Sequence, residues 1–300
     1  MFFRDAPVRI DGIRISLGLG LSSGISGNLT ASPMSAVMPP SLPPGISSGV
    51  AVVTGAGSGL GRAIALAFAA SGMRVLLVGR RREPLEATAR ACGPGAAVCP
   101  ADVAEPTGRA AIVAAMRAGP SVRFLVHGAG IHSVAALAAL TPEDFRATLA
   151  TNVEARFFLT RDLLPWFAPG ARVLFLGSNS ATRARRGGTA YCVAQAGSFM
   201  LHTCLKAELG PRGILVGGAI PSPAHTPMVD ALLAAAPDVF PDTLLYRELH
   251  AAGRLISPAV VARFICWLLR ETTPEEFVAQ EWRITDESHH ARWLGGAALT

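Results

Sequence analysis

A glycine-rich turn near residue 55 is the first stretch of this sequence whose composition and spacing could support chemistry. Residues 50–53 are apolar and mostly β-branched, which is typical of a buried strand. The next segment, 54–61, carries glycine at four alternate positions, and residues 62–70 are rich in helix formers. A strand, a glycine turn and a helix in this order leave free N–H groups where a phosphate can bind. The segment therefore predicts a nucleotide site, with an ordinary tight turn as the alternative.

The composition allows one large domain and does not favour a nucleic-acid partner. Half of the 300 residues are hydrophobic and only 16% are charged, so a large core is easily filled. The net charge is +6 and the pI is near 9.6. The arginines are spread along the chain, apart from clusters at 80–82 and 183–186, and Lys206 is the sole lysine. A dispersed charge of this kind indicates no nucleic-acid surface.

The cysteine pattern favours a reducing compartment. The five cysteines are scattered and form no Cys-x-x-Cys pair, which is typical of reduced thiols in a cytoplasmic protein. No apolar run reaches the ~18 residues that a membrane span needs, so we expect no membrane partner.

The sequence divides into three parts. Residues 1–48 are rich in Gly, Ser and Pro, and we expect either a disordered extension or a start codon assigned too early. Residues 49–290 alternate strands with helices, and residues 291–300 are expected as a tail. The alternation predicts an α/β fold with one Rossmann-like, doubly wound parallel sheet of about seven strands, covered by helices on both faces in a single domain. Ligands are then expected at the carboxyl ends of the strands.

Several motifs follow one another at a spacing that resembles the short-chain dehydrogenase/reductase family over residues 50–285. The motifs are Thr54–Gly61 (Thr-Gly-x-x-x-Gly-x-Gly), Asp102-Val103, His127–Gly130 in the place of Asn-Asn-Ala-Gly, Asn152, Ser178 with Tyr191 thirteen residues later, and Pro221–Thr226. Residues 253–258 look like the sepiapterin/benzil reductase branch.

The resemblance implies a catalytic group of Ser178, Tyr191, Asn152 and Gln195. Tyr191 would give a proton to a carbonyl oxygen, Ser178 would polarise that oxygen, and a nicotinamide would supply the hydride. A buried core tyrosine and a serine that caps a strand end are the structural alternatives.

The resemblance also implies a set of cofactor-binding residues. They are Thr54, Gly55, Gly57, Ser58, Gly59, Leu60, Gly61, Arg80, Asp102, Val103, Gly128, Ala129, Gly130, Gln195, Pro221 and Thr226. Arg80 follows the second expected strand, where an acidic residue would bind the adenosine ribose. An arginine there suits a 2′-phosphate, so NADP(H) is favoured over NAD(H), with a solvated basic turn as the alternative.

The most consequential departure from the family pattern is at Gln195, where the family has lysine four residues after the tyrosine. An amide can bind the nicotinamide ribose, but it cannot lower the pKa of Tyr191 by charge. Lys206 lies about 16 Å further along the helix, so only the arginines at 183, 185 and 186 are candidates to supply that charge. A second departure is Gly128, which lacks the side chain that would steady the central strands.

Two functions follow as hypotheses. One is an NADP(H)-dependent oxidoreductase that reduces a ketone or diketone to an alcohol. The alternative is a catalytically impaired member of the family that binds a nucleotide and acts as a regulator. The apolar segment 221–250 predicts a lid over an apolar carbonyl substrate, with a packed core of the lid itself as the alternative. The resemblance implies a homodimer or homotetramer paired through the helices near Asn152 and Tyr191.

Overall fold

A seven-stranded sheet forms the centre of the computed structural model, which describes residues 49–117 and 119–299. Its spatial order is β3-β2-β1-β4-β5-β6-β7, and every neighbouring pair is parallel. The strands are β1 (Val50–Thr54), β2 (Arg74–Gly79), β3 (Ala96–Pro100), β4 (Val122–His127), β5 (Phe167–Leu176), β6 (Leu215–Ile220) and β7 (Glu281–Arg283). The chain order reverses between β1 and β4, so a ligand site is expected at their carboxyl ends.

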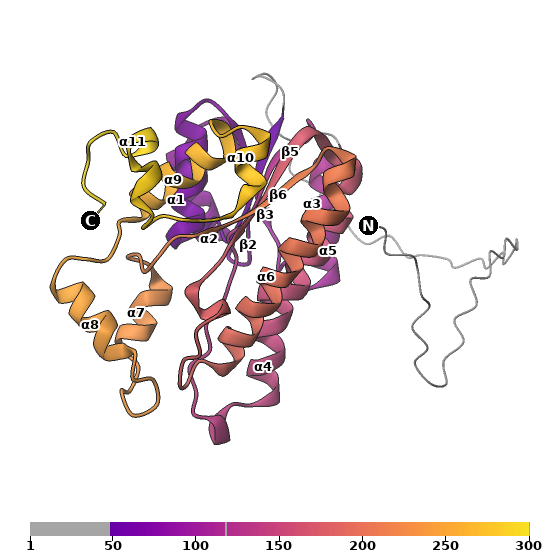
Figure 1. The fold of residues 1–300 in the computed structure, drawn as a ribbon. Helices are drawn as coiled ribbons and strands as arrows, with labels where there is room; N and C mark the ends of the chain where they lie inside the picture. The colour runs from indigo at the N-terminus through magenta and orange to yellow at the C-terminus, as the bar shows by residue number, and fades with distance from the viewer. Residues whose placement is uncertain (1–48, 118, 300) are drawn as a thin grey trace, which may run out of the picture. The chain divides into compact units, whose positions relative to one another are not determined.

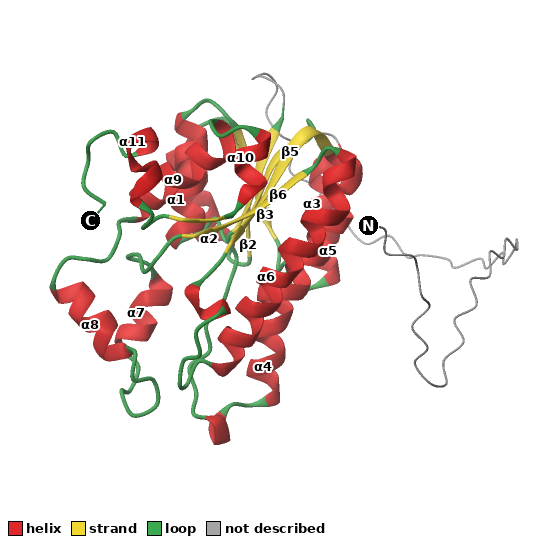
Figure 2. Ribbon diagram, in the orientation of Figure 1, coloured by secondary structure: helices red, strands yellow, loops and turns green. Residues whose placement is uncertain are grey.

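Two layers of helices cover the sheet, as the alternation predicts. Figures 1 and 2 show α1 and α9 on one side of the sheet and α3, α5 and α6 on the other. The longer helices are α1 (Gly59–Ala70), α2 (Arg82–Cys92), α3 (Pro106–Arg117), α6 (Thr189–Leu209), α8 (Thr243–Ala251) and α9 (Pro258–Arg270). The shorter ones are α4 (Pro142–Leu149), α5 (Ala155–Asp162), α7 (Pro227–Leu233), α10 (Pro274–Ala279) and α11 (His290–Trp293).

Each face of the sheet has its own hydrophobic core. Phe68 of α1 and Phe264 of α9 belong to the first core, and Ile112 of α3 and Leu205 of α6 belong to the second. Because helices cover both faces of the sheet, β1 is buried at every residue. A strand in this position needs a continuous apolar run, as residues 50–53 provide.

Local turns limit two strands whose bounds differ from those expected. The sequence predicts a strand over residues 97–103, but β3 ends at Pro100, because Asp102 Oδ1 accepts a hydrogen bond from the Ala104 N–H at 3.0 Å and turns the chain. It also predicts a strand over residues 213–219, but β6 begins at Leu215, because Gly213 has a φ of 72° and forms a turn.

The sequence predicts a helical region with Thr141 as its N-cap that continues through Asn152 to about Phe167. It begins as predicted, because the Thr141 hydroxyl accepts from the Asp144 N–H at 3.0 Å. It is not one helix: a π-helical turn, Ala150–Glu154, separates α4 from α5. Such turns occur most often at functional sites, and this one carries Asn152.

Both ends of the chain bear on the expected domain organisation. Residues 1–48, interpreted above as an extension, lie outside the described residues. Residues 291–299, interpreted as a tail, contribute Trp293 and Leu294 to the first core, where both side chains are at most 7% exposed.

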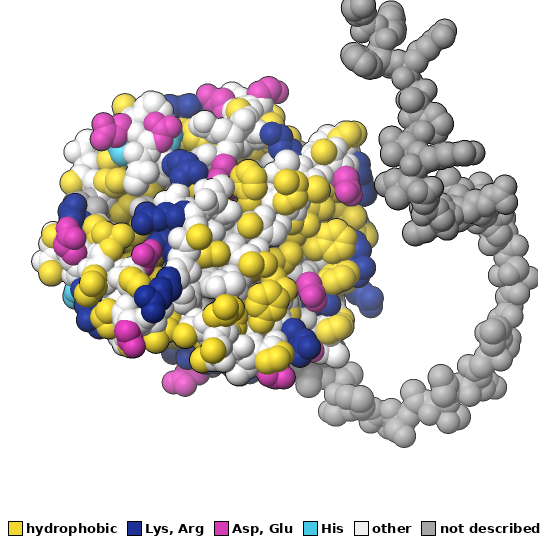
Figure 3. Space-filling model, turned by 60° about the horizontal axis from the view of Figure 1, so that its bottom comes forward, with side chains coloured by type: hydrophobic (Ala, Val, Ile, Leu, Met, Phe, Trp, Pro, Cys, Tyr) yellow, Lys and Arg dark blue, Asp and Glu magenta, His cyan; other side chains and the backbone are white. Residues whose placement is uncertain are grey.

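Helix apolarity, the surface and the cysteines bear on the expected surroundings of the protein. Among the residues described, none of the helices combines the length and apolarity that crossing a bilayer requires. Figure 3 shows a broad area of hydrophobic side chains on the right of the molecule, the side on which α5 and α6 lie in Figure 1. All five cysteines are unpaired. A cytoplasmic location stays a prediction.

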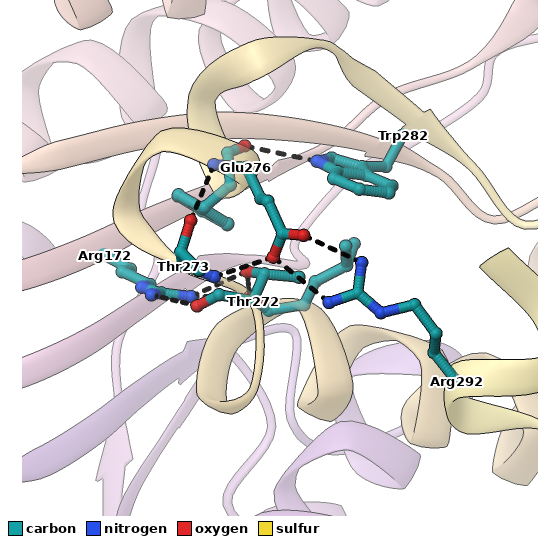
Figure 4. A network of polar contacts seen from close by, with 8 residues as sticks. Arg172, Thr272, Thr273, Glu276, Trp282 and Arg292 are labelled. Carbon is teal, nitrogen blue, oxygen red and sulfur yellow. Dashed lines mark hydrogen bonds and ion pairs between the residues drawn. The ribbon is translucent and has the colours of Figure 1, made fainter.

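A buried arginine ties the C-terminal segment to the sheet (Figure 4). Arg172 of β5 is 7% exposed and donates to the Leu268 carbonyl at 2.8 Å and to the Thr272 carbonyl and hydroxyl at 2.6 and 2.9 Å. Directly after Thr272, Thr273 and Glu276 form a capping box at the start of α10. This network fixes α10 and therefore the course of the chain into β7.

Replacing Arg172 by Ala should destabilise the fold. The change leaves the Thr272 carbonyl without its donor, at about 1–3 kcal/mol, and removes two further bonds, because the Leu268 carbonyl then keeps only the Thr272 hydroxyl. We expect the free energy of unfolding, measured by urea titration of Trp fluorescence, to fall by about 2–4 kcal/mol. Arg146→Ala is the matched control, because the Arg146 side chain is 76% exposed and should change stability by less than about 0.5 kcal/mol. Equal effects of the two changes would contradict this account.

Candidate active site

The glycine turn brings two strand ends into backbone contact. Gly55 has a φ of 72°, and a Cβ there would lie 2.8 Å from the Gly128 carbonyl oxygen. A Cβ on Gly61 would lie 2.3 Å from the Gly55 carbonyl oxygen. Only glycine fits at these two positions, because any side chain would push β1, β4 or α1 apart.

The start of α1 offers free donors to an anion. The helix begins after Ser58, the first N–H groups of a helix have no intrahelical acceptor, and no acidic residue lies in the first turn. Positive partial charge from the helix dipole adds to these donors. The turn can therefore bind a phosphate group, as its sequence predicts.

Thr54 performs a structural task beneath this turn. Its side chain is 1% exposed, and the hydroxyl accepts from the Gly128 and Ala129 N–H groups, both at 3.0 Å. The hydroxyl also donates to the Val126 carbonyl at 3.3 Å. Thr54 thus holds the end of β1 to the end of β4.

The expectation that Gly128 leaves the central strands unsteadied is wrong. A Cβ on Gly128 would lie 2.6 Å from the Thr54 carbonyl oxygen, so the strands are closer here than a side chain would allow. His127 adds a further tie: it is 2% exposed, and its Nε2 lies 2.9 Å from the Thr160 hydroxyl of α5. Burial, then the charge of Arg156, lowers the pKa of His127, so the ring is neutral.

A small pocket of about 150 Å³ lies at the ends of β2 and β3. The predicted adenosine-side residues Arg80, Asp102 and Val103 line it together with Gly57 and Ser58. Arg80 is exposed and Asp102 is half-buried. The structure therefore brings the predicted residues for this end of a dinucleotide to one place.

A larger cavity of about 660 Å³ continues from the same turn toward α7 and α8. Ser178, Tyr191 and Gln195 face it from the end of β5 and the first turns of α6. The other predicted cofactor residues that line it are Gly55, Ser58, Gly59, Leu60, Gly61, Gly128, Ala129, Gly130, Pro221 and Thr226.

Asn152 lies behind this cavity and positions its wall. It is fully buried, its Oδ1 accepts from the Ile131 N–H at 3.0 Å, and its Nδ2 donates to the Ile131 carbonyl at 2.8 Å. Both ends of the amide are used in fixing the segment after β4.

Tyr191 and Ser178 meet in the cavity through a side-chain hydrogen bond. Burial raises the pKa of Tyr191, and the bond to Ser178 and the charge of Arg156 oppose that rise. The net direction is upward, so the phenol is protonated at neutral pH and can donate a proton.

A histidine that the sequence analysis did not single out stacks on this phenol. The His132 ring lies parallel to the Tyr191 ring, with the centroids 3.9 Å apart. Burial, followed by the charge of Arg185, lowers the pKa of His132 to about 4, so the imidazole is neutral. The His132 ring therefore brings no charge to this side of Tyr191.

Gln195 is 4% exposed, and its Oε1 is buried without a hydrogen-bond partner. An orphaned acceptor at this place fits a hydroxyl donor such as a ribose. Of the three arginines expected to supply charge, Arg185 forms an ion pair with Asp242 and a 2.8 Å bond to Ser180. The pairing with Asp242 weakens the charge that Arg185 presents to the cavity, and Arg185 still lowers the pKa of Tyr191.

Arg156, which none of the sequence motifs marks as a site residue, also lines the large cavity. It is 4% exposed and lies on α5, one helical turn after Asn152. The sequence does contain a signal for Arg156. It lies four positions after Asn152, and residues at this spacing share one face of a helix. An arginine on that face interrupts a buried stretch.

The expected lid consists of α7 and α8. Val229, Leu232 and Phe240 pack with Tyr246 in a third hydrophobic cluster, so part of the apolar pattern belongs to the lid's own core. The other part faces the large cavity, as Met228, Leu245 and Leu249 do, whereas Leu244 is 60% exposed. The cavity wall opposite Tyr191 is accordingly apolar.

The fold and the glycine turn define a dinucleotide-binding α/β protein, and comparison with known proteins identifies its family. The family model described as short chain dehydrogenase matches residues 49–236. The chain belongs to the short-chain dehydrogenase family, whose members are oxidoreductases.

Individual relatives agree with this membership. Galactitol 2-dehydrogenase (L-tagatose-forming) from Cereibacter sphaeroides is 31% identical over 204 residues, covering 66% of this chain and 79% of that protein. Alignments to further curated relatives span between 43% and 85% of those proteins' lengths.

Solved structures show the same fold. A variant of actinorhodin polyketide ketoreductase with NADPH has a TM-score of 0.72 and 26% identity, covering 79% of this chain and 95% of that one. The 3-ketoacyl-(acyl-carrier-protein) reductase from Brucella melitensis, complexed with NADH, has a TM-score of 0.66 and 28% identity, covering 78% and 95%. The sepiapterin/benzil reductase branch stays a prediction.

Proposed function

We propose that this protein is an NADP(H)-dependent reductase that converts an apolar ketone or diketone to an alcohol. The observation that carries the proposal is the Ser178–Tyr191 pair, which faces a cavity continuous with the glycine turn. The NADPH and NADH bound in the two similar ketoreductase-type structures support a nicotinamide cofactor here.

The residues present fit such a cofactor. The free N–H groups at the start of α1 suit the pyrophosphate, and the orphaned Gln195 Oε1 suits a ribose hydroxyl. Arg80 and Arg81, both lining the smaller pocket, suit a 2′-phosphate. When bound, the nicotinamide supplies the hydride.

The chain's own residues supply the proton and the polarisation. Tyr191 is protonated because burial raises its pKa, so it can donate to a substrate oxygen in the reductive direction. The Ser178 hydroxyl, bonded to the phenol, can polarise the same oxygen. The apolar wall of α7 and α8 excludes water and favours an apolar substrate.

Gln195 favours a second candidate function, a nucleotide-binding protein without catalysis. Lysine is the family residue at this position, and the amide brings no charge to Tyr191. This candidate shares the cofactor site with the first and differs only in turnover.

Tyr191→Phe should separate the two candidates. It removes the proton donor while keeping the ring, so we expect NADPH reduction of diketones to fall at least about 100-fold. NADPH binding, followed by fluorescence, should be retained, because the phenol is not part of the glycine turn. Cys192→Ala, next along the helix, is the control and should keep its activity. Wild-type binding of NADPH without turnover on a broad carbonyl panel would establish the non-catalytic candidate instead.

Arg80→Ala should change cofactor preference. Losing a charge-assisted contact of about 1.5 kcal/mol or more weakens NADPH binding about tenfold, whereas NADH affinity should hardly change. Isothermal titration calorimetry measures both constants. Arg90→Ala on the exposed side of α2 is the matched control. An equal loss for both nucleotides would reject a 2′-phosphate contact.

We also propose a homodimer or homotetramer paired through α6. Val193 and Met200, spaced by seven residues on α6, are 45% and 57% exposed. Residues at this spacing share a helix face, and the hydrophobic area in Figure 3 lies on the side that carries α6.

Met200→Asp should convert the oligomer to a monomer, because it places a charge in an apolar interface. Light scattering after size-exclusion chromatography measures the mass directly. Leu137→Asp, at a residue that is 83% exposed and lies outside α6, should leave the mass unchanged. A wild-type mass equal to one chain would reject pairing through α6.

A further inference from the structure

Arg156 is a buried cation with no carboxylate beside it among the residues that the structure describes. The side chain is 4% exposed and forms no ion pair there. Its Nη1 donates to the Leu176 carbonyl at 3.0 Å and to the Ser198 hydroxyl at 2.8 Å. A buried charge without a counter-ion is costly, so its presence calls for a specific explanation.

Other side chains packed around Arg156 do not neutralise it. The guanidinium lies 5.9 Å from the centre of the Phe175 ring, and the imidazoles of His127 and His202 lie in the same region. Burial lowers the pKa of both histidines, to about 4 for His202, where Lys206 and then Arg156 lower it further; at His127 the charge of Arg156 adds to burial. Both rings are therefore neutral, so neither pairs with the positive charge of Arg156.

Arg156 is held at the wall of the active-site cavity. It lines this cavity together with Tyr191 and Gln195. Its Nη2 lies 3.9 Å from the point that a Cβ on Gly130 would occupy, and Asn152 Oδ1 lies 3.4 Å from the same point. The two bonds to Leu176 and Ser198 fix the guanidinium between α5, β5 and α6.

We propose that Arg156 supplies the positive charge that the family obtains from lysine at position 195, so the cation of this active site has moved from α6 to α5. Gln195 then keeps only the hydrogen-bonding part of that task. The proposal rests on the reductase function above and identifies a positioning residue, because Arg156 acts through the phenol of Tyr191.

Of the positive charges around Tyr191, Arg156 lowers the phenol pKa more than Arg185 does. Arg185, from the loop before α6, is paired with Asp242, and Ser178 of the β5 end is uncharged. His132, after β4, is neutral, and Tyr246 of α8 raises the pKa of Tyr191. Arg156 lowers the pKa of Tyr191, and in return Tyr191 raises that of Arg156, which burial lowers to about 10.

The proposal changes what Gln195→Lys should do. If the site lacked a cation, lysine at 195 would restore it and improve catalysis. With Arg156 in place, lysine adds a second buried cation, so the single variant should melt at a lower temperature than wild type. In Arg156→Gln/Gln195→Lys the cation returns to α6, and stability and the Tyr191 pKa should both recover.

The test titrates Tyr191 directly, without cofactor or substrate. Tyr191 and Tyr246 are the two tyrosines of the sequence, so Tyr246→Phe leaves one phenol. Labelling with 3,5-difluorotyrosine lowers the phenol pKa into a range where the protein is folded, and ¹⁹F NMR follows the one resonance with pH. In this background Arg156→Gln should raise the midpoint by about one pH unit or more, and Arg156→Lys should keep it near the reference.

Arg161→Gln is the matched control on the same helix. Its side chain is 56% exposed and pairs with Asp162, so it should leave the Tyr191 midpoint unchanged. A purely structural role for Arg156 would lower the melting temperature without moving the midpoint, and that result would overturn the proposal. If Arg156→Gln does not fold, the double variant decides: recovery of the reference midpoint supports the proposal, and failure to fold rejects it.

The titration is independent of turnover. A wild-type protein that reduces no carbonyl would reject the reductase function, while a shift in Arg156→Gln would still establish the electrostatic link to Tyr191. If the wild type is active and Arg156→Gln leaves the Tyr191 midpoint unmoved, the electrostatic link between Arg156 and Tyr191 is rejected while the reductase function stands.

Discussion

Close backbone contact between the ends of β1 and β4 is the constraint on which this structure depends. Gly55, Gly61 and Gly128 leave no room for side chains there, and Thr54 ties the two strand ends together with three hydrogen bonds. Because the contact is so tight, α1 starts directly above the strands and its free N–H groups face the opening at the switch point of the sheet. A bulkier contact would move α1 and close this opening.

The rest of the site is assembled on that opening from segments far apart in the sequence. The end of β5 provides Ser178, the start of α6 provides Tyr191 and Gln195, and α7 with α8 forms the apolar wall. The π-helical turn between α4 and α5 sets Asn152 against the segment after β4 and turns Arg156 inward. Membership of the short-chain dehydrogenase family explains this plan, within which Arg156 is proposed to supply the charge that Gln195 lacks.

Much of the fold follows from local patterns of apolar residues and helix formers in the sequence. Apolar runs followed by helix formers predict β1 and α1, and the same alternation predicts the parallel sheet of seven strands. The predicted strand bounds are wrong where a side chain bonds to the backbone a few residues away, as at Asp102, which ends β3 early. The division of the helical segment around Asn152 has no signal in hydrophobic periodicity, because the residues at both junctions, Leu149–Ala150 and Glu154–Ala155, keep right-handed helical dihedrals.

The sequence by itself determined the family motifs, the phosphate-binding turn and the spacing of Ser178 and Tyr191, because each depends on residues close together in the chain. Tertiary structure alone decided that Gly128 must be glycine, that Arg185 is paired with Asp242, and that Arg156 faces the cavity. These outcomes depend on which groups meet across β1, β4, α5 and α6. Charges and close contacts act through space, and distance through space is set only when the sheet and its helices have packed.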